Sequence, residues 1–227
     1  MKPRRVIAGV FKAALGEARY AELRRRSLGW RSSRTAFGDI YEHGGWKCAE
    51  SASGTGSTLT GTVALRRALP GLMRQLNVHS ILDAGCGDVN WISTVDLAGV
   101  AYIGMDVVPA LIERNQAAYG DETHRFICAD ISCDPLPIAA AVLCRHCLIH
   151  LSNQRVLMAL RNFKRSGCRY LLTTTFPRLQ VNRDIWNGSF RPLNLQANPF
   201  DLPEPLLTLE DADDSAVLAV WRLGEIP

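Results

Sequence analysis

The sequence predicts an α/β fold in which a doubly wound, mostly parallel sheet of seven strands ends in an antiparallel hairpin. Between residues 79 and 176, short and almost continuously apolar runs alternate with helical segments, as in parallel sheets that helices cover on both faces. The last two apolar runs, LLTLE and AVLAVWRL, are separated only by the acidic segment DADDS, which is typical of a hairpin. A chain of 227 residues that is 47% hydrophobic is large enough for one such domain.

The strands and helices follow from the apolar runs and from the residues that interrupt them. Strands are expected at 79–87, 101–107, 124–130, 140–147 and 169–176, before the hairpin runs at 206–210 and 216–223. Helices are expected at 4–26, 60–76, 89–98, 109–120 and 152–167. Pro70 is expected to kink the second helix or to end part of it. Residues 32–57 lack helical periodicity and predict a loop, as does the long Asn- and Pro-rich segment 177–205.

The charge of the chain is unevenly distributed along it. Residues 1–34 carry a net charge of +8 and residues 195–227 a net charge of −6, although the whole chain has only +4. The basic segment predicts a helix that either contacts an anionic partner, such as nucleic acid or a membrane surface, or forms a solvated face. We therefore divide the chain into an N-terminal segment, 1–58, with this basic helix and a Gly- and Ser-rich cap, and a catalytic domain, 59–227.

The cysteines and the N-terminus predict a cytoplasmic protein. Seven cysteines are an odd number, and most lie in apolar runs, which favours free thiols in a reducing compartment. The first apolar stretch is interrupted by Lys12 and followed by ELRRR, unlike a signal peptide. No window of about 18 apolar residues exists, so no membrane-spanning helix is expected.

Acidic residues follow three of the predicted strands. Asp83 begins the turn Asp-Ala-Gly-Cys-Gly-Asp after the first strand, Asp106 ends the second, and Asp130 ends the third. Because the carboxyl ends of parallel strands lie at one edge of a sheet, these groups predict a nucleoside site. The phosphate-binding sequence GK[ST] is absent, and Asn90 replaces the third glycine of a dinucleotide motif. A ligand that has a ribose but no phosphates therefore fits better.

The ordered stretches LDAGCGDVNW, GMD, CADI, CRHCLIHLS and YLLTTTF resemble class I S-adenosylmethionine-dependent methyltransferases, over about residues 79–176. The resemblance implies a Rossmann-like methyltransferase fold with S-adenosylmethionine as cofactor. It implies that Gly85 and Gly87 flank the methionine part, that Asp83 helps to hold the amino end and that Asp106 binds the ribose. It also implies that Asp130 and the Ile131 amide meet the adenine. Many members have a third glycine where this chain has Val89.

The flanking segments IYEHGGWKCAESASGTGST and NRDIWNGSFRPLNLQANPFDLPEP are similar to a narrower methyltransferase group, in which an aspartate stands at the position of His146. SASGTGS is interpreted either as a cap or as a flexible linker. In the first case, backbone amides of Ser53, Gly54 and Gly56 would reach the carboxylate of the cofactor.

Two histidines near the end of the fourth predicted strand are candidates for a catalytic base. They are His150 and His146. The pKa of an unperturbed histidine lies near neutrality, and the resemblance places this strand end beside the transferred methyl group. The alternatives are that His150 caps the next helix or packs in the core, and that alignment alone suffices without a base. Arg145 either anchors the substrate or forms a structural ion pair. Cys144 and Cys147 lack a second Cys/His pair, so no metal site is expected.

The segment 182–200 is a candidate substrate-binding loop because it combines aromatic and amide side chains, including Trp186 and Asn187 with Arg191. Trp91 is expected in the core. The predicted reaction is methyl transfer from S-adenosylmethionine to a hydroxyl group of a small molecule or saccharide. The N/D-P-P-Y/F motif of many N-methyltransferases is missing. The alternatives are an RNA methyltransferase that grips RNA with its basic N-terminus, and an S-adenosylmethionine-binding protein without turnover.

Overall fold

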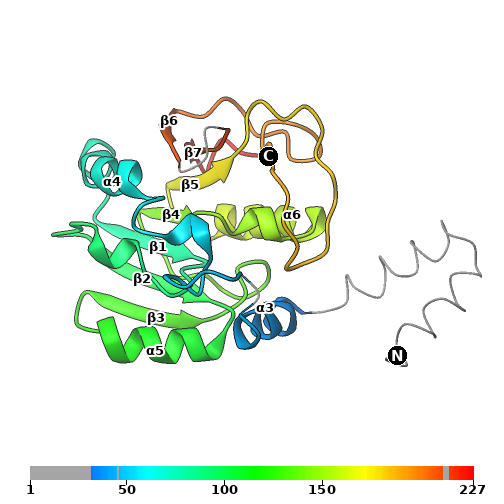
Figure 1. Cartoon of the computed structure of the whole chain (residues 1–227). Coiled ribbons are helices and arrows are strands. Elements are labelled where there is room, and N and C mark those ends of the chain that lie inside the picture. Colours follow the sequence, from blue (N-terminus) through cyan, green and yellow to red (C-terminus); the bar gives the residue numbers. More distant parts are fainter. Residues whose placement is uncertain (1–31, 45, 212–214) are drawn as a thin grey trace, which may run out of the picture.

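The computed structural model describes residues 32–44, 46–211 and 215–227. Seven strands form one sheet in the order β3-β2-β1-β4-β5-β7-β6 (Figure 1). The strands are β1 Ser80–Ala84, β2 Ala101–Asp106, β3 His124–Cys128, β4 Ala141–Cys144, β5 Tyr170–Thr175, β6 Leu207–Glu210 and β7 Val217–Arg222. The first five are parallel, and β7 pairs antiparallel with both β5 and β6. The predicted doubly wound sheet with its terminal hairpin is confirmed.

Both faces of the sheet are buried, which explains why its strands are apolar at nearly every position. Successive residues of a strand point to opposite faces. Accordingly Leu82 belongs to one hydrophobic cluster and its neighbour Ile81 to the other. The first cluster includes α6 (Asn153–Arg165) and the segment after β5, and the second includes α4 (Val63–Gln75) and α5 (Pro109–Tyr119).

The structure differs from the prediction at three places before β2. Residues 32–57 are not all loop, because α3 spans Ser33–Glu42 and is capped by the Ser32 side chain, which accepts a hydrogen bond from the Thr35 amide. The helix α4 continues through Pro70 without interruption. The helix expected at 89–98 is only the 3-10 turn Ile92–Thr94. The basic helix expected at 4–26 lies outside the described residues.

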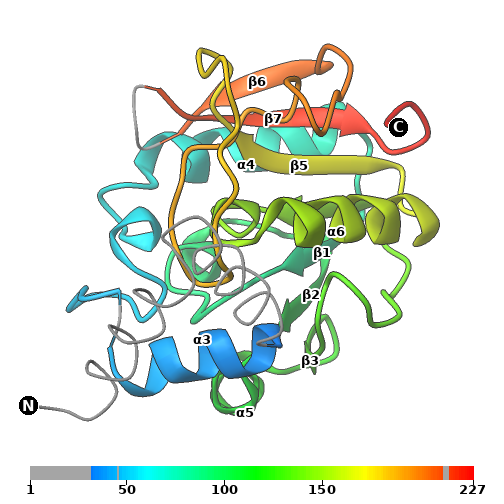
Figure 2. The ribbon, with the colours of Figure 1, turned by 90° about the vertical axis from the view of Figure 1, so that its right-hand side faces the viewer.

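The segment 177–205 folds back over the edge of the sheet as an ordered strap. In Figure 2 this yellow-to-orange segment descends past the start of α6 toward α3. Its tip contacts α3 closely, since a Cβ atom added to Gly188 would lie 2.7 Å from Cδ1 of Ile40. The Gly188 amide also donates to the carbonyl of His150 (2.8 Å). The strap therefore joins α3 to the residues that follow β4. In the described part of the chain, no helix is long and apolar enough to cross a membrane.

Candidate functional site

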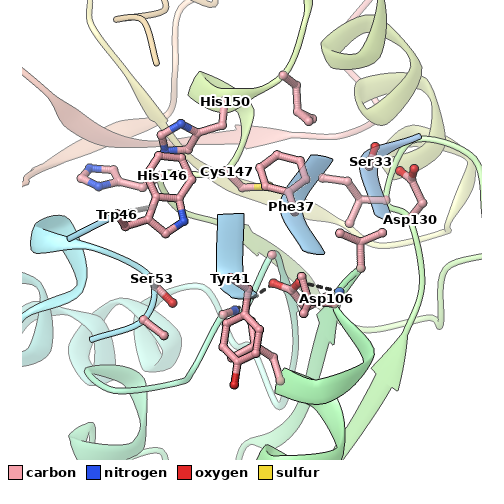
Figure 3. A pocket seen from close by; sticks show the side chains of 18 of the residues that line it. Ser33, Phe37, Tyr41, Trp46, Ser53, Asp106, Asp130, His146, Cys147 and His150 are labelled. Atoms are coloured by element: carbon pink, nitrogen blue, oxygen red, sulfur yellow. Dashed lines mark hydrogen bonds between the residues drawn. The ribbon is translucent and has the colours of Figure 1, made fainter. Parts of the chain in front are cut away.

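A cleft opens at the carboxyl ends of β1, β2 and β4, where the strand order reverses between β1 and β4. This is the usual place for a ligand site in a doubly wound sheet. Figure 3 shows Asp106 in the middle of the cleft, Asp130 and Ser33 toward one end, and Trp46 with His150 toward the other.

The turn after β1 has the backbone conformation that the glycine pattern predicts. Gly85 and Gly87 both have positive φ angles, 91° and 56°, and both line the cleft. Val89 also has a positive φ, 51°. This is the position at which related enzymes often have a third glycine, and a β-branched residue is strained there. The side chain of Val89 is buried in the core, and this burial offsets part of the strain.

Asp106 ends β2 with its carboxylate facing the cleft. One oxygen accepts from the Gly87 amide and the other from the Val108 amide, both at 3.0 Å (Figure 3). Burial raises the pKa of Asp106, while these amides counteract the rise. Each oxygen retains a second lone pair, so the carboxylate can accept two further hydrogen bonds.

Asp130 and Ile131 line the far end of the cleft after β3. The Asp130 carboxylate accepts from the amide and hydroxyl of Ser132 and from Arg155 (2.9 Å). Burial favours a higher pKa for Asp130, but the Ser132 hydrogen bonds and the Arg155 charge outweigh it and lower the pKa. The Ile131 amide donates to no protein atom within the described residues.

Asp83 lies beneath the glycine turn and does not line the cleft. It is 4% exposed, and its Oδ2 accepts a short hydrogen bond from the Tyr102 hydroxyl (2.6 Å). Burial raises the pKa of Asp83 to about 7, although the Tyr102 hydrogen bond opposes the rise. Its direct partner in the structure is therefore Tyr102.

The cap segment 51–57 is fastened to the glycine turn by Asp88. The Asp88 carboxylate accepts from the Ser51 hydroxyl (2.9 Å), the Ala52 amide (2.7 Å) and the Ser53 hydroxyl (2.9 Å). The Asp88 amide in turn donates to Ser53 Oγ. Packing is so close that a Cβ atom on Gly87 would overlap the Ser53 hydroxyl. SASGTGS is therefore docked against the glycine turn. Ser53 lines the cleft, whereas Gly54 and Gly56 line a second pocket beside it.

Arg145 and His146 connect this cap to the segment after β6. The Arg145 guanidinium donates to Asp211 through Nε (3.1 Å) and Nη2 (2.5 Å), and to the Gly56 carbonyl through Nη1 (2.8 Å). His146 packs against Gly56, and its Nε2 lies 3.3 Å from Asp211. Burial favours a higher pKa for Asp211, but His146 and Arg145 outweigh it and lower the pKa. Of the two roles considered for Arg145, the structure contains the ion pair.

His150 stands where the cleft meets the second pocket. Its ring lies 4.3 Å from that of Trp46 and 5.9 Å from that of Phe190, between centroids. Nδ1 is 2.9 Å from the Ser189 carbonyl. A carbonyl only accepts, so Nδ1 carries the proton and Nε2 keeps a lone pair. Burial lowers the pKa of His150 to about 4, which keeps the ring neutral near pH 7.

The three strap residues predicted to bind substrate contact other parts of the protein instead. Arg191 is buried, donates to Asn153 Oδ1 (2.7 Å) and approaches the Leu148 and Ile149 carbonyls. Asn187 accepts from the Ser152 amide (3.0 Å) at the start of α6. Trp186 is half-buried, and its carbonyl accepts from the Ser189 amide. None of the three lines either pocket.

Comparison with known proteins agrees with this architecture. Residues 81–166 match the family of methyltransferase domains. Residues 81–166 therefore form a methyltransferase domain. No curated relative matches the sequence.

Several solved methyltransferases share the fold of this methyltransferase. Human N-acetylserotonin methyltransferase in complex with S-adenosylmethionine has 12% identity and a TM-score of 0.56, over 85% of this chain and 60% of that one. The 1,6-didemethyltoxoflavin-N1-methyltransferase of Burkholderia thailandensis has 17% identity and a TM-score of 0.56, over 83% and 86%. Magnesium protoporphyrin IX methyltransferase of Synechocystis PCC 6803 has 14% identity and a TM-score of 0.55, over 85% and 97%. At these identities the likeness concerns the fold.

Parts of the methyltransferase site had no signal in the sequence. Phe37 and Tyr41 line the cleft from α3, in a segment expected to be loop. Asp88 and Asp211 hold the cap through contacts with residues far away in the sequence. Only the N-cap residue Ser32 could have indicated α3. In the described residues, no group of three His, Cys, Asp or Glu side chains could hold a metal ion.

Proposed function

We propose that this methyltransferase transfers the methyl group of S-adenosylmethionine to a hydroxyl oxygen of a small molecule. The observation that carries the proposal is His150, a neutral imidazole with a fixed tautomer and a free Nε2 lone pair between two connected pockets. The names of two proteins of similar fold contain small-molecule acceptors, N-acetylserotonin and 1,6-didemethyltoxoflavin.

The residues of the cleft fit the cofactor. The free lone pairs of Asp106 suit two ribose hydroxyls, and the unpaired Ile131 amide suits an acceptor nitrogen of the adenine. Gly85 and Gly87 let the backbone approach the methionine part closely. Ser53 lies beside this turn. When bound, the cofactor supplies an electrophilic methyl group on a positively charged sulfur.

The protein contributes alignment and a proton acceptor. Trp46 and His150 line both the cofactor cleft and the second pocket, so an acceptor bound in the second pocket would lie beside the cofactor cleft. His150 Nε2 takes the hydroxyl proton as the oxygen gains the methyl group. A pKa near 4 suffices, because an oxygen that is methylated and still protonated is a much stronger acid than this imidazolium.

The test is to incubate the protein with methyl-labelled S-adenosylmethionine and a cell extract separated into small-molecule, RNA, protein and lipid pools. We expect label in the small-molecule pool, attached through an oxygen. Label confined to RNA or protein would refute the proposal, and no label with tight cofactor binding would favour the non-catalytic alternative.

The cofactor assignment is tested with Asp106→Ala, measured by calorimetry. Loss of the carboxylate should weaken binding of S-adenosylmethionine at least tenfold, about 1.4 kcal/mol. Glu113→Ala, which removes an exposed carboxylate from α5, is the matched control and should bind normally. Equal affinity in both variants would exclude the ribose assignment.

A further inference from the structure

The second pocket adjoins the cofactor cleft and shares Trp46, Ser53, His146 and His150 with it. It continues beyond these residues to Phe176 and Phe190. An acceptor bound there would reach the cofactor only past His150. The lining of this pocket therefore indicates which acceptors the enzyme can take.

Aromatic side chains form the walls of the pocket, and the remaining surface is uncharged. Trp46 precedes the cap, Phe176 follows β5, and Phe190 belongs to the strap. Among the described residues that line the pocket, none carries a carboxylate, an ammonium or a guanidinium group. Arg145, the nearest cation in sequence to His146, is already paired with Asp211. A charged acceptor would thus lose its hydration without gaining a counterion.

The polar groups that a saccharide would need are used for other contacts. Asn182 donates to the carbonyls of Asn194 and Ala197, and its own carbonyl accepts from the Asn194 amide. Asp184 accepts from the Asn153 amide at the start of α6. The amide- and carboxylate-rich composition of the strap thus stabilises its own fold. The pocket itself offers three aromatic ring faces, the hydroxyls of Ser53 and Thr55 and the two histidines, which suits a flat ring that carries a hydroxyl group.

We infer that the acceptor is an uncharged aromatic compound with a ring hydroxyl, bound between Trp46, Phe176 and Phe190. This inference rests on the proposed function and makes its substrate class specific. Offset stacking on such side chains favours a planar ring. The oxygen of the hydroxyl group on the ring forms a bond to the methyl carbon. It displaces the sulfur, which keeps the electron pair of the broken carbon–sulfur bond. The hydroxyl proton passes to Nε2 of His150 and then to water.

The test compares four probes with the full-length protein: 2-naphthol, 6-hydroxy-2-naphthoate, decahydro-2-naphthol and methyl glucoside. Binding to the protein saturated with S-adenosylhomocysteine is measured by calorimetry, and methyl transfer is measured with labelled cofactor. We expect 2-naphthol to bind at least tenfold more tightly than the carboxylate or the saturated analogue, and to be methylated. Equal or tighter binding of the carboxylate, the saturated analogue or the glucoside would overturn the inference, as would no binding of 2-naphthol.

A variant of the strap provides a second readout. Phe190 is 61% exposed, so Phe190→Ala should fold, and we expect it to raise KM for 2-naphthol about fivefold or more at unchanged cofactor affinity. Val181→Ala, on the same strap and 70% exposed, is the control and should match the wild type. Methylation of the glucoside in place of 2-naphthol would refute this inference and leave O-methylation intact. If instead the wild-type protein binds the cofactor but transfers no methyl group to any acceptor, the proposed function itself would be refuted.

Discussion

His150 is the residue whose environment most directly determines its chemistry. Trp46 and Phe190 lie beside the ring, and Ser189 fixes the proton on Nδ1. The lowered pKa, about 4 against an ordinary 6.5, means that the folded protein holds a neutral ring where an unfolded chain would begin to bind a proton. His150 therefore reduces stability as pH falls from about 6.5 to about 4, and it has no such effect above that window.

The same pKa gives a prediction for the rate. Because Nε2 is available down to about pH 4, kcat/KM should be flat from pH 8 to about 5 and fall only below that. His150→Gln should lower turnover by about 10²–10⁴-fold and change cofactor affinity less than twofold. The exposed His79, before β1, gives the control His79→Gln. Full turnover in His150→Gln would mean that alignment alone performs the transfer.

Single residues also show how much of the site could be predicted from the sequence. Asp106 could be placed in the cleft because its distance from Gly87 puts both at strand ends on one edge. Asp83 belongs to the same pattern, yet it points to Tyr102 below the turn. Sequence order identifies the edge of the sheet on which a residue lies. Whether its side chain reaches solvent depends on tertiary neighbours that no local pattern encodes.

At the scale of elements, the cap and the glycine turn form one unit. Three donors from residues 51–53 converge on Asp88, which is at the turn's end. Asp88→Ala should leave these donors unsatisfied, lower the free energy of unfolding by about 1–3 kcal/mol and weaken cofactor binding at least tenfold. Hydrogen exchange should rise at residues 51–57. Asp96→Ala, at an exposed turn, is the control, and normal exchange in Asp88→Ala would contradict a role in fastening the cap.

The strands were predictable as elements because burial on both faces imposes apolar runs that the sequence displays directly. The helix α3 was not predictable in this way. Its only buried residues are Ser33 and Ala36, and it contains Gly38, so hydrophobic periodicity is weak. It is held by contacts with distant parts of the chain, such as Gly188 of the strap against Ile40. Elements that cover a site are stabilised by such contacts and carry little signal of their own.

At the scale of the whole molecule, the acidic C-terminal part has a structural explanation. It forms the β6–β7 hairpin, and Asp211 turns inward to pair with Arg145 beside the cap. One acidic residue of this part thus contributes to the site. The basic charges of residues 1–31 lie outside the described residues. They are the remaining basis for the alternative of an RNA substrate.

Deleting residues 1–31 distinguishes a small-molecule substrate from an RNA substrate. Within the described chain, the residues that line the cleft and the second pocket begin at Ser33, so the shortened protein should bind S-adenosylmethionine within twofold of the full chain and still methylate its small-molecule acceptor. If RNA is the substrate, the full chain should bind RNA with a steep salt dependence, since each released counterion adds to the slope, and the deletion should abolish RNA binding and methylation together. Calorimetry of the cofactor, RNA binding at about 50 and 200 mM salt, and label transfer to both pools measure these outcomes. Transfer to RNA that depends on residues 1–31, with none to small molecules, would establish the alternative.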